Sequence, residues 1–319
     1  MTTFAAFRAG DMAICGRFEP SSADLRGFAE AVGFDGQTGA AMRWLVVARQ
    51  LRAIVDELLT RTSSQGAPGL ERVDWGAQVQ PGDQLTVRRE TLETRVSSKR
   101  PGIGLTRFRF DTLNQHDEVV LSVSQWMMFR RDDAAEAPML SATSASAASV
   151  SAASARCADV HYVPPGGEQR MARMPDPWSA WHRVSPGAIA QLGSYRFDAQ
   201  DIIAFARAFD PQPFHIDAEA ARASLFGRLC ASGLQTAVAW AALAEDSRWV
   251  VQPKGLRHLR WHRPVFAGET IAYRSVARDV NLDAARPGLA WITRSNQGLD
   301  AEGQVVIELE DVVAATIAG

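Results

Sequence analysis

The residues best suited to chemistry in this sequence are Asp210 and His215, which lie five positions apart. Pro211 and Pro213 stand between them, and a proline fixes its own φ angle and restricts the residue before it. A carboxylate and an imidazole on such a stiff segment can share one water molecule and exchange protons with it. The spacing therefore indicates general acid–base chemistry on water.

The flanking residues predict how this segment is held. Asp210 follows an apolar helical pattern and is expected to end that helix, and the two prolines then keep the chain extended. Asp217 can cap the next helix, which we expect over residues 218–226. An Asp/His pair near a helix end also has an ordinary role in capping and surface structure, so the pair alone does not establish a site.

A longer pattern surrounds the pair. It comprises an aromatic residue, a spacer that ends in Asp, a polar–Pro–hydrophobic–His sequence and a small residue six positions after the His. In this sequence the positions are filled by Phe205, Asp210, Gln212, Pro213, Phe214, His215 and Ala221. A glycine and an Ala-Ser-Gly turn follow, at Gly227 and at residues 231–233. The segment closely resembles the MaoC-like, or (R)-specific enoyl-CoA hydratase, family. It departs from that family's motif at Gln212, where many members have Asn, and at residues 208–209, where many have a small residue and Gly.

The resemblance implies a hydro-lyase that acts on an acyl-CoA thioester without a metal or redox cofactor. Asp210 and His215 would hold water for syn addition to a trans-2-enoyl thioester. One would take the proton of the water and the other would protonate C2, in an order that the sequence does not decide. Gly233 would offer its backbone N–H to the thioester oxygen, and the positive end of a helix independently suits the enolate charge that develops there.

The same segment supplies three further candidates for substrate binding, namely Gln212, Phe214 and Ser232. Gln212 could instead bond the loop backbone, and Ser232 could instead cap the helix that follows.

A basic cluster lies further along the chain. Arg260 and Arg263, with Lys254 and Arg257, could bind the phosphates of CoA or could form an ordinary solvated face. Two histidines in this region, at positions 258 and 262, have no carboxylate that would complete a metal set, so no metal site is expected.

The elements that position these residues are encoded twice. Residues 75–120 align without a gap to residues 261–306 at a constant offset of 186, including a shared Arg-Pro-Gly triplet. Between the two copies, residues 131–174 are rich in Ala, Ser and Pro and indicate a linker. We therefore expect an N-terminal unit over residues 1–130 and a C-terminal unit over residues 175–319.

Each copy opens with an amphipathic helix. It starts near Ser21 in the first copy and near Asp198 in the second, where a capping pattern precedes apolar residues at helical spacing. The offset here is 177, so the second copy gains nine residues before its strands, in the acid–base segment. A second, largely apolar helix follows over residues 42–59 and over residues 233–244, and helices of that kind are normally buried.

Strand-like runs separated by turn residues complete each copy. An antiparallel sheet of this kind must bury one face, and the apolar helix is its partner. The expected fold class is α+β: a double hot-dog, in which two tandem units each wrap an antiparallel sheet around a central helix. Asp35 and Gln37 echo Asp210 and Gln212, but the first copy has no histidine before His116, so a working dyad is expected in the second copy alone.

Composition excludes other classes of protein. The 319 residues are 46% hydrophobic, enough for a large core, and the formal net charge of −2 offers no polybasic surface for nucleic acid or a membrane. Cys15, Cys157 and Cys230 lie far apart and indicate neither a disulfide framework nor a zinc site. Without an apparent signal peptide or a membrane-spanning apolar run, a soluble cytoplasmic protein is expected, in which two chains could associate as a homodimer.

The leading function is reversible hydration of a trans-2-enoyl-CoA to an (R)-3-hydroxyacyl-CoA. Two alternatives stay open: an acyl-CoA thioesterase on the same fold, and a non-catalytic protein that binds acyl thioesters, because a fold does not fix a function. The motifs do not specify the length of the acyl chain, or whether CoA or a carrier protein bears it.

Overall fold

The computed structural model describes residues 4–34, 39–131, 170–174, 184–224, 226–244 and 250–316. The first half of the chain opens with a 3-10 turn, η1 (Phe4–Ala6), followed by β1 (Met12–Phe18) and the helices α1 (Ser22–Val32) and α2 (Gly39–Glu57). A second 3-10 turn, η2 (Leu59–Arg61), leads to the strands β2 (Gly69–Trp75), β3 (Leu85–Val96), β4 (Ile103–Leu113) and β5 (Val119–Arg130).

The second half repeats this order with extra elements at the acid–base segment. It begins with β6 (Met171–Arg173), β7 (Ile189–Arg196) and α3 (Ala199–Phe209). Two short helices, α4 (Pro213–Ile216) and α5 (Ala218–Arg222), precede the buried helix α6 (Gly233–Ala244). The strands are β8 (Val250–Trp261), β9 (Thr270–Leu282), β10 (Leu289–Leu299) and β11 (Val305–Thr316).

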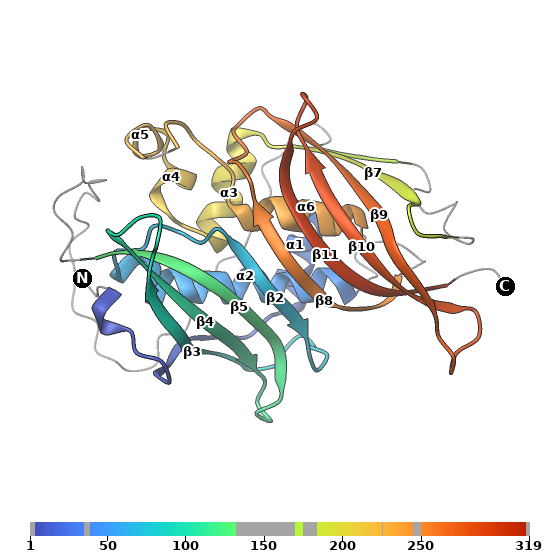
Figure 1. The fold of residues 1–319 in the computed structure, drawn as a ribbon, viewed down its shortest axis with the longest axis horizontal. Helices are drawn as coiled ribbons and strands as arrows, with labels where there is room; N and C mark the ends of the chain where they lie inside the picture. The colour runs from blue at the N-terminus through green and yellow to red at the C-terminus, as the bar shows by residue number, and fades with distance from the viewer. Residues whose placement is uncertain are drawn as a thin grey trace.

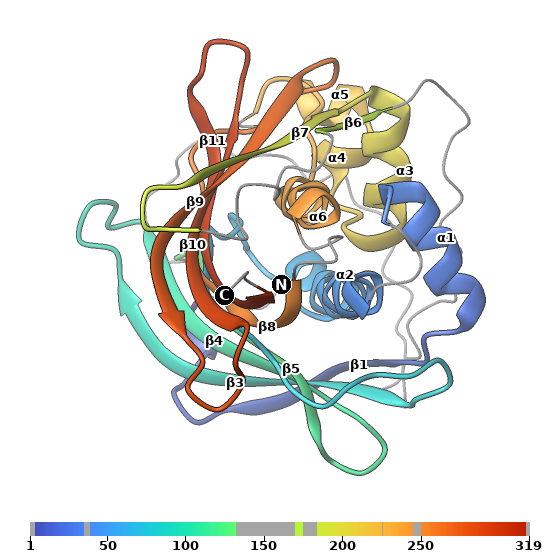
Figure 2. The same ribbon diagram turned by 90° about the vertical axis from the view of Figure 1, so that its right-hand side faces the viewer.

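All these strands form one antiparallel sheet, in the order β1-β3-β4-β5-β2-β8-β11-β10-β9-β7-β6. The sheet crosses the front of the molecule in Figure 1. Seen from its end, it curves around α2 and α6, and α1 and α3 lie on its open side (Figure 2). Inward-facing residues alternate with outward-facing ones along each strand, as a sheet with one buried face requires. This is the predicted double hot-dog arrangement.

The strand bounds follow the offset found in the sequence. β4 and β10 have the same length at an offset of 186, and so do β5 and β11, whereas α1 and α3 are related by an offset of 177. The additional residues of the second copy therefore lie between α3 and β8, where α4 and α5 stand. The two copies thus share a scaffold of helices and strands, and the second copy has additional residues in the acid–base segment.

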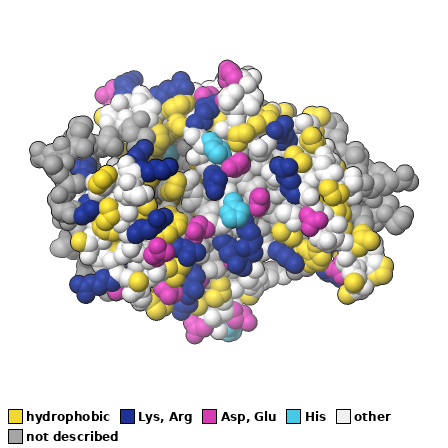
Figure 3. Space-filling model, in the orientation of Figure 1, with side chains coloured by type: hydrophobic (Ala, Val, Ile, Leu, Met, Phe, Trp, Pro, Cys, Tyr) yellow, Lys and Arg dark blue, Asp and Glu magenta, His cyan; other side chains and the backbone are white. Residues whose placement is uncertain are grey.

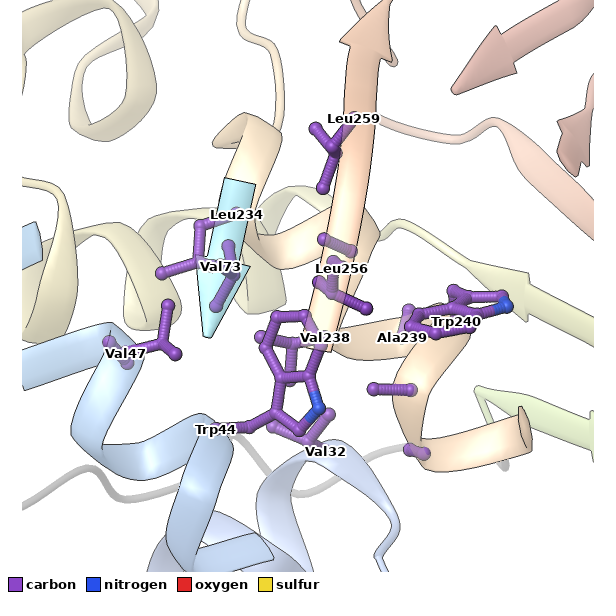
Figure 4. Close-up of a cluster of buried hydrophobic side chains, with 14 of the residues drawn as sticks. Val32, Trp44, Val47, Val73, Leu234, Val238, Ala239, Trp240, Leu256 and Leu259 are labelled. Carbon is purple, nitrogen blue, oxygen red and sulfur yellow. The ribbon is translucent and has the colours of Figure 1, made fainter. Parts of the chain in front are cut away.

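The two units share one core. β2 pairs with β8 and joins the half-sheets, and the indoles of Trp44 on α2 and Trp240 on α6 meet at 6.3 Å between ring centroids. Figure 4 shows these rings among aliphatic side chains from α1, both central helices and both joining strands. Trp44 and Trp240 are fully buried. The C-terminal site consequently rests on packing that the N-terminal unit provides.

Some predicted boundaries were wrong. In each unit a strand precedes the first helix, β1 before α1 and β7 before α3, and the short patterns of these strands were not recognised in the sequence. The capping box at Ser21 and Asp24 is present, but Asp198 makes no side-chain capping bond at the start of α3. The predicted partner of that cap, Asp201, is instead fully buried and accepts hydrogen bonds from Tyr195 and Gln235.

The Ala/Ser/Pro-rich linker predicted over residues 131–174 lies largely outside the described residues. Its end is described, and there Met171–Arg173 pairs with β7 as the edge strand β6, so the second hot-dog includes residues assigned to the linker.

The outer face of the sheet bears lysine, arginine, acidic and histidine side chains in close mixture (Figure 3). Among the described helices, none combines the length and the apolar composition needed to cross a membrane.

Candidate active site

The acid–base segment begins where α3 ends. The backbone N–H of Asp210 still bonds to Ala206 O at 2.8 Å, but its own φ and ψ of −145° and 66° have left the helical region. Pro211 follows and cannot continue the helix. The prediction that both prolines keep the chain extended was wrong for Pro213, which instead occupies the first turn of α4, a position that tolerates a missing N–H.

The turn between α3 and α4 brings the two functional side chains together. His215 lies on α4, and its Nε2 is 3.5 Å from Oδ2 of Asp210. Asp210 is 4% exposed and His215 is 6% exposed. The separation is too long for a good hydrogen bond and short enough for one small molecule to contact both atoms. Sequence spacing thus correctly predicted a close carboxylate–imidazole pair.

Two side chains hold the carboxylate of Asp210. The Ser232 hydroxyl donates to Oδ2 at 2.6 Å, and the Gln212 amide donates to Oδ1 at 2.8 Å. Each carboxylate oxygen keeps further acceptor capacity beyond these bonds. Neither donor has the alternative role expected from the sequence: Gln212 bonds the carboxylate and not the loop backbone, and Ser232 bonds the same carboxylate across 22 residues of chain.

A backbone carbonyl orients the imidazole. Nδ1 of His215 is 2.8 Å from the carbonyl oxygen of Cys230. A carbonyl can only accept, so Nδ1 must carry the proton, and in the neutral ring Nε2 then presents its lone pair toward Asp210. Sequence reasoning missed this contact, because any residue type can supply a carbonyl.

The thiol of Cys230 is also close, with Sγ 3.7 Å from Nδ1 of His215. Burial, followed by the negative charge of Asp210, raises the pKa of Cys230 from its ordinary value of 9.0 to about 12. Cys230 is therefore a neutral thiol beside the imidazole and not a nucleophile at ordinary pH.

Gly233 starts α6 next to Ser232. The first N–H groups of a helix have no partner within the helix and carry partial positive charge. A side chain at this position would collide with its neighbour, since an added Cβ would lie 2.5 Å from Cε2 of Trp261. The Trp261 indole N–H in turn donates to the Gly233 carbonyl at 2.9 Å. Trp261 thus fixes the start of α6. In the alignment of the two copies Trp261 matches Trp75, but that match did not predict this role.

Phe214 packs against the opposite side of the histidine. Its ring lies 4.4 Å from the ring of His215 in an edge-on arrangement and 4.9 Å from that of Phe226. Phe214 is partly buried and covers the imidazole with apolar surface.

The predicted basic cluster lies elsewhere on the surface. Trp261 faces inward to α6, so its strand neighbour Arg260 projects from the outer face, where it is exposed and 3.9 Å from Glu308. Arg263 bonds Asp300 at 2.6 Å, Glu269 and the carbonyl of Pro264. Arg263 thus has partners in its own turn and in the distant turn of Asp300, and neither arginine lies in the group around Asp210.

The corresponding place in the first copy lies partly outside the described residues, including Asp35 and Gln37. Where it is described, Gly39 begins α2 as Gly233 begins α6. In the described parts of both units, no three His, Cys, Asp or Glu residues gather as metal ligands.

Comparison with known proteins agrees with this architecture. Residues 183–286 match the family described as MaoC like domain. A MaoC domain protein dehydratase from Chloroflexus aurantiacus has a similar solved structure, with 18% identity and a TM-score of 0.74 over 100% of this chain and 98% of that chain. RV0216 of Mycobacterium tuberculosis, which has a double hotdog fold, is 16% identical with a TM-score of 0.60 over 99% of this chain and 98% of that chain. The MaoC-like dehydratase of Phytophthora capsici is 14% identical, with a TM-score of 0.59 over 96% of each chain.

No curated protein sequence matches this one. At the identities of the solved structures the likeness establishes the fold, and the chain is a double hot-dog protein as predicted. Residues 183–286, the region that matches the MaoC like domain, contain both Asp210 and His215.

Proposed function

We propose that the protein adds water reversibly to a trans-2-enoyl-CoA to give an (R)-3-hydroxyacyl-CoA. The observation that carries the proposal is the buried pair of His215 Nε2 and Asp210 Oδ2 at 3.5 Å, beside the start of α6. The match to a dehydratase family supports the class of reaction.

The pair suits a water molecule as its ligand. Nε2 of His215 presents a lone pair, and Oδ2 of Asp210 keeps one beyond the bond from Ser232. Two acceptors that face each other require a donor between them, and water has two O–H groups. The water oxygen is then left with its own lone pairs free to attack carbon.

The proton route follows from this geometry. As the water oxygen bonds to C3 of the enoyl group, Nε2 of His215 takes one water proton, and the electron pair of the C2=C3 double bond moves toward the thioester oxygen. The imidazolium then returns a proton to C2 on the same face, which gives syn addition with no further acid. Asp210 holds the water and faces the imidazolium charge during the reaction.

The enolate that forms between these steps needs stabilisation at the thioester oxygen. The N–H of Gly233, at the positive end of α6, is placed beside Ser232 and hence beside Asp210. Phe214 and Phe226 cover the imidazole with apolar surface, which strengthens electrostatic interactions inside the site.

The test is to incubate the purified protein with crotonyl-CoA and longer trans-2-enoyl-CoAs. Loss of the absorbance of the conjugated thioester, with (R)-3-hydroxyacyl-CoA as product and no free thiol, supports the proposal. Release of free CoA with the C2=C3 bond intact identifies a thioesterase instead. Binding of the thioester without any chemical change identifies a non-catalytic binding protein.

A further inference from the structure

The interiors of the two hot-dog units differ in one electrostatic feature. In the C-terminal unit, four buried polar residues form a connected network. Arg294 pairs with Asp311, Asn296 donates to Asp311 at 2.9 Å, and Ser275 donates to Asn296. All four are at most 2% exposed. The single buried positive charge is thus matched by a single negative charge.

The 186-residue offset identifies the same four positions in the N-terminal unit. There Arg89 replaces the serine, Phe108 replaces the arginine, Phe110 replaces the asparagine and Gln125 replaces the aspartate. The strand registers agree, because Arg89 is opposite Phe110, and Phe108 is opposite Gln125. An arginine has therefore been kept inside this unit on a different strand, while the carboxylate that would neutralise it is a neutral amide.

Arg89 has no hydrogen-bond or ion-pair partner among the described residues, and its Nε is buried. Its guanidinium lies 5.5 Å from the ring of Phe7 and 5.4 Å from the ring of Phe108. Aromatic rings attract a cation but accept no ordinary hydrogen bond from its N–H groups. The Arg89 side chain as a whole is partly exposed, so an anion can reach its guanidinium beside these rings.

Further polar groups on the same inner face have no partner. The hydroxyls of Thr91 and Thr106 are buried without a hydrogen bond, and both residues are 0% exposed. Thr91 lies two residues from Arg89 on β3 and opposite Phe108, and Thr106 lies two residues from Phe108 on β4. Gln125 completes the group from β5, opposite Phe108.

We infer that the N-terminal hot-dog binds a carboxylate that carries an apolar tail, with Arg89 as its principal partner. One guanidinium matches the single charge of a carboxylate and can bond both of its oxygens. The hydroxyls of Thr91 and Thr106 are hydrogen-bond donors for the same group. Phe7, Phe108 and Phe129, which are buried and contact one another at 4.8–6.1 Å between centroids, form the apolar part of the same inner face. In Figure 1, β3, β4 and β5 form the lower left of the molecule, and α4 of the acid–base site lies above them.

The inference does not depend on the proposed hydration. Its test is calorimetric titration of the full chain with sodium octanoate, with the uncharged methyl ester of octanoate as the control ligand. The matched variants are Arg89→Met and Arg88→Met, since Arg88 is the neighbouring arginine on the opposite face of β3, where it pairs with Asp111. We expect octanoate to bind the unmodified chain and the Arg88→Met variant, and Arg89→Met to weaken binding by about 10-fold to 100-fold.

Thermal unfolding without ligand gives a second readout. Arg89→Met should unfold at the same or a higher temperature, because it removes a partly buried charge that pairs with no carboxylate among the described residues. Equal octanoate affinity in the Arg89→Met variant, or equal binding of the ester and the acid, would overturn the inference.

The carboxylate could be a free acid or the distal end of an acyl chain. Comparison of suberyl-CoA with octanoyl-CoA separates these sources. An Arg89-dependent preference for suberyl-CoA, without binding of octanoate, assigns the carboxylate to the acyl chain. If neither octanoate nor suberyl-CoA binding depends on Arg89, the inference is wrong.

Discussion

Replacing Gly233 by Ala tests how the start of α6 contributes to the reaction. The added Cβ would lie 2.5 Å from Cε2 of Trp261 and 2.9 Å from Cδ2 and Cζ2, about 1 Å inside ordinary carbon–carbon contact. The indole cannot yield easily, because its N–H is bonded to the Gly233 carbonyl at 2.9 Å. Either the ring or the first turn of the helix must therefore move.

Two consequences follow from this displacement. Overpacking of this size costs about 1–3 kcal/mol of folding free energy. Movement of the Gly233 N–H by about 1 Å removes a hydrogen-bond donor from the thioester oxygen, and loss of one such donor typically lowers kcat about 100-fold to 1000-fold. We expect a fall of that order in the hydration of crotonyl-CoA, with a modest fall in Tm.

The sister copy provides the control for this experiment. Gly39 starts α2 as Gly233 starts α6, but an added Cβ there meets only the end of the Arg43 side chain, at 3.4 Å. Gly39→Ala should leave both kcat and the fold unchanged. In the double variant Gly233→Ala/Trp261→Phe, the smaller ring should make the loss of stability less than the sum of the two single losses. A Gly233→Ala enzyme with normal kcat would refute the role given to the start of α6.

Three further predictions concern buried groups. Ser232→Ala removes the 2.6 Å bond to Asp210, so kcat should fall by about 10-fold or more, as measured by steady-state hydration; an unchanged kcat would show that this bond does not position the carboxylate. Arg294→Met leaves Asp311 buried without its cation and should lower the free energy of unfolding, measured in urea, by about 3–5 kcal/mol. A loss below about 1 kcal/mol would contradict the pairing of Arg294 with Asp311. Cys230 should resist iodoacetamide near pH 9 in the folded chain and react quickly in urea, because its pKa is about 12 when folded and returns to about 9 on unfolding. Rapid alkylation of the folded chain would contradict the burial of this thiol. Because the pKa of Cys230 is higher in the folded than in the unfolded chain, unfolding becomes more favourable as pH rises from about 9 to about 12.

The sequence was most informative where a local pattern carries the signal. Turn residues and alternating strands at a fixed offset predicted β3 to β5 and β9 to β11, and the long apolar stretches predicted α2 and α6. The short strands β1, β6 and β7 were missed, because their sequences give a weak signal without the strands that they pair with.

The site shows the same division between local and distant signals. Asp210 and His215 could be paired from the intervening prolines. The partners that orient them come from residues 230–233 across the fold, and one of these partners is a backbone carbonyl, which no residue type reveals. The pairing of Arg263 with Asp300 likewise involves a turn that is distant in sequence, so the sequence left open whether the basic cluster binds CoA phosphates or forms a solvated face.

The central claim is that His215 and Asp210 together activate water. The most direct measurement is the steady-state rate of crotonyl-CoA hydration by His215→Ala and Asp210→Asn, with circular dichroism to verify the fold. The controls are His262→Ala, which follows β8 and bonds Glu308, and Asp198→Asn at the start of α3. The account predicts that each dyad variant loses about 100-fold or more in kcat while the controls keep normal rates and all variants stay folded. Folded dyad variants that hydrate crotonyl-CoA as fast as the unmodified protein would contradict it.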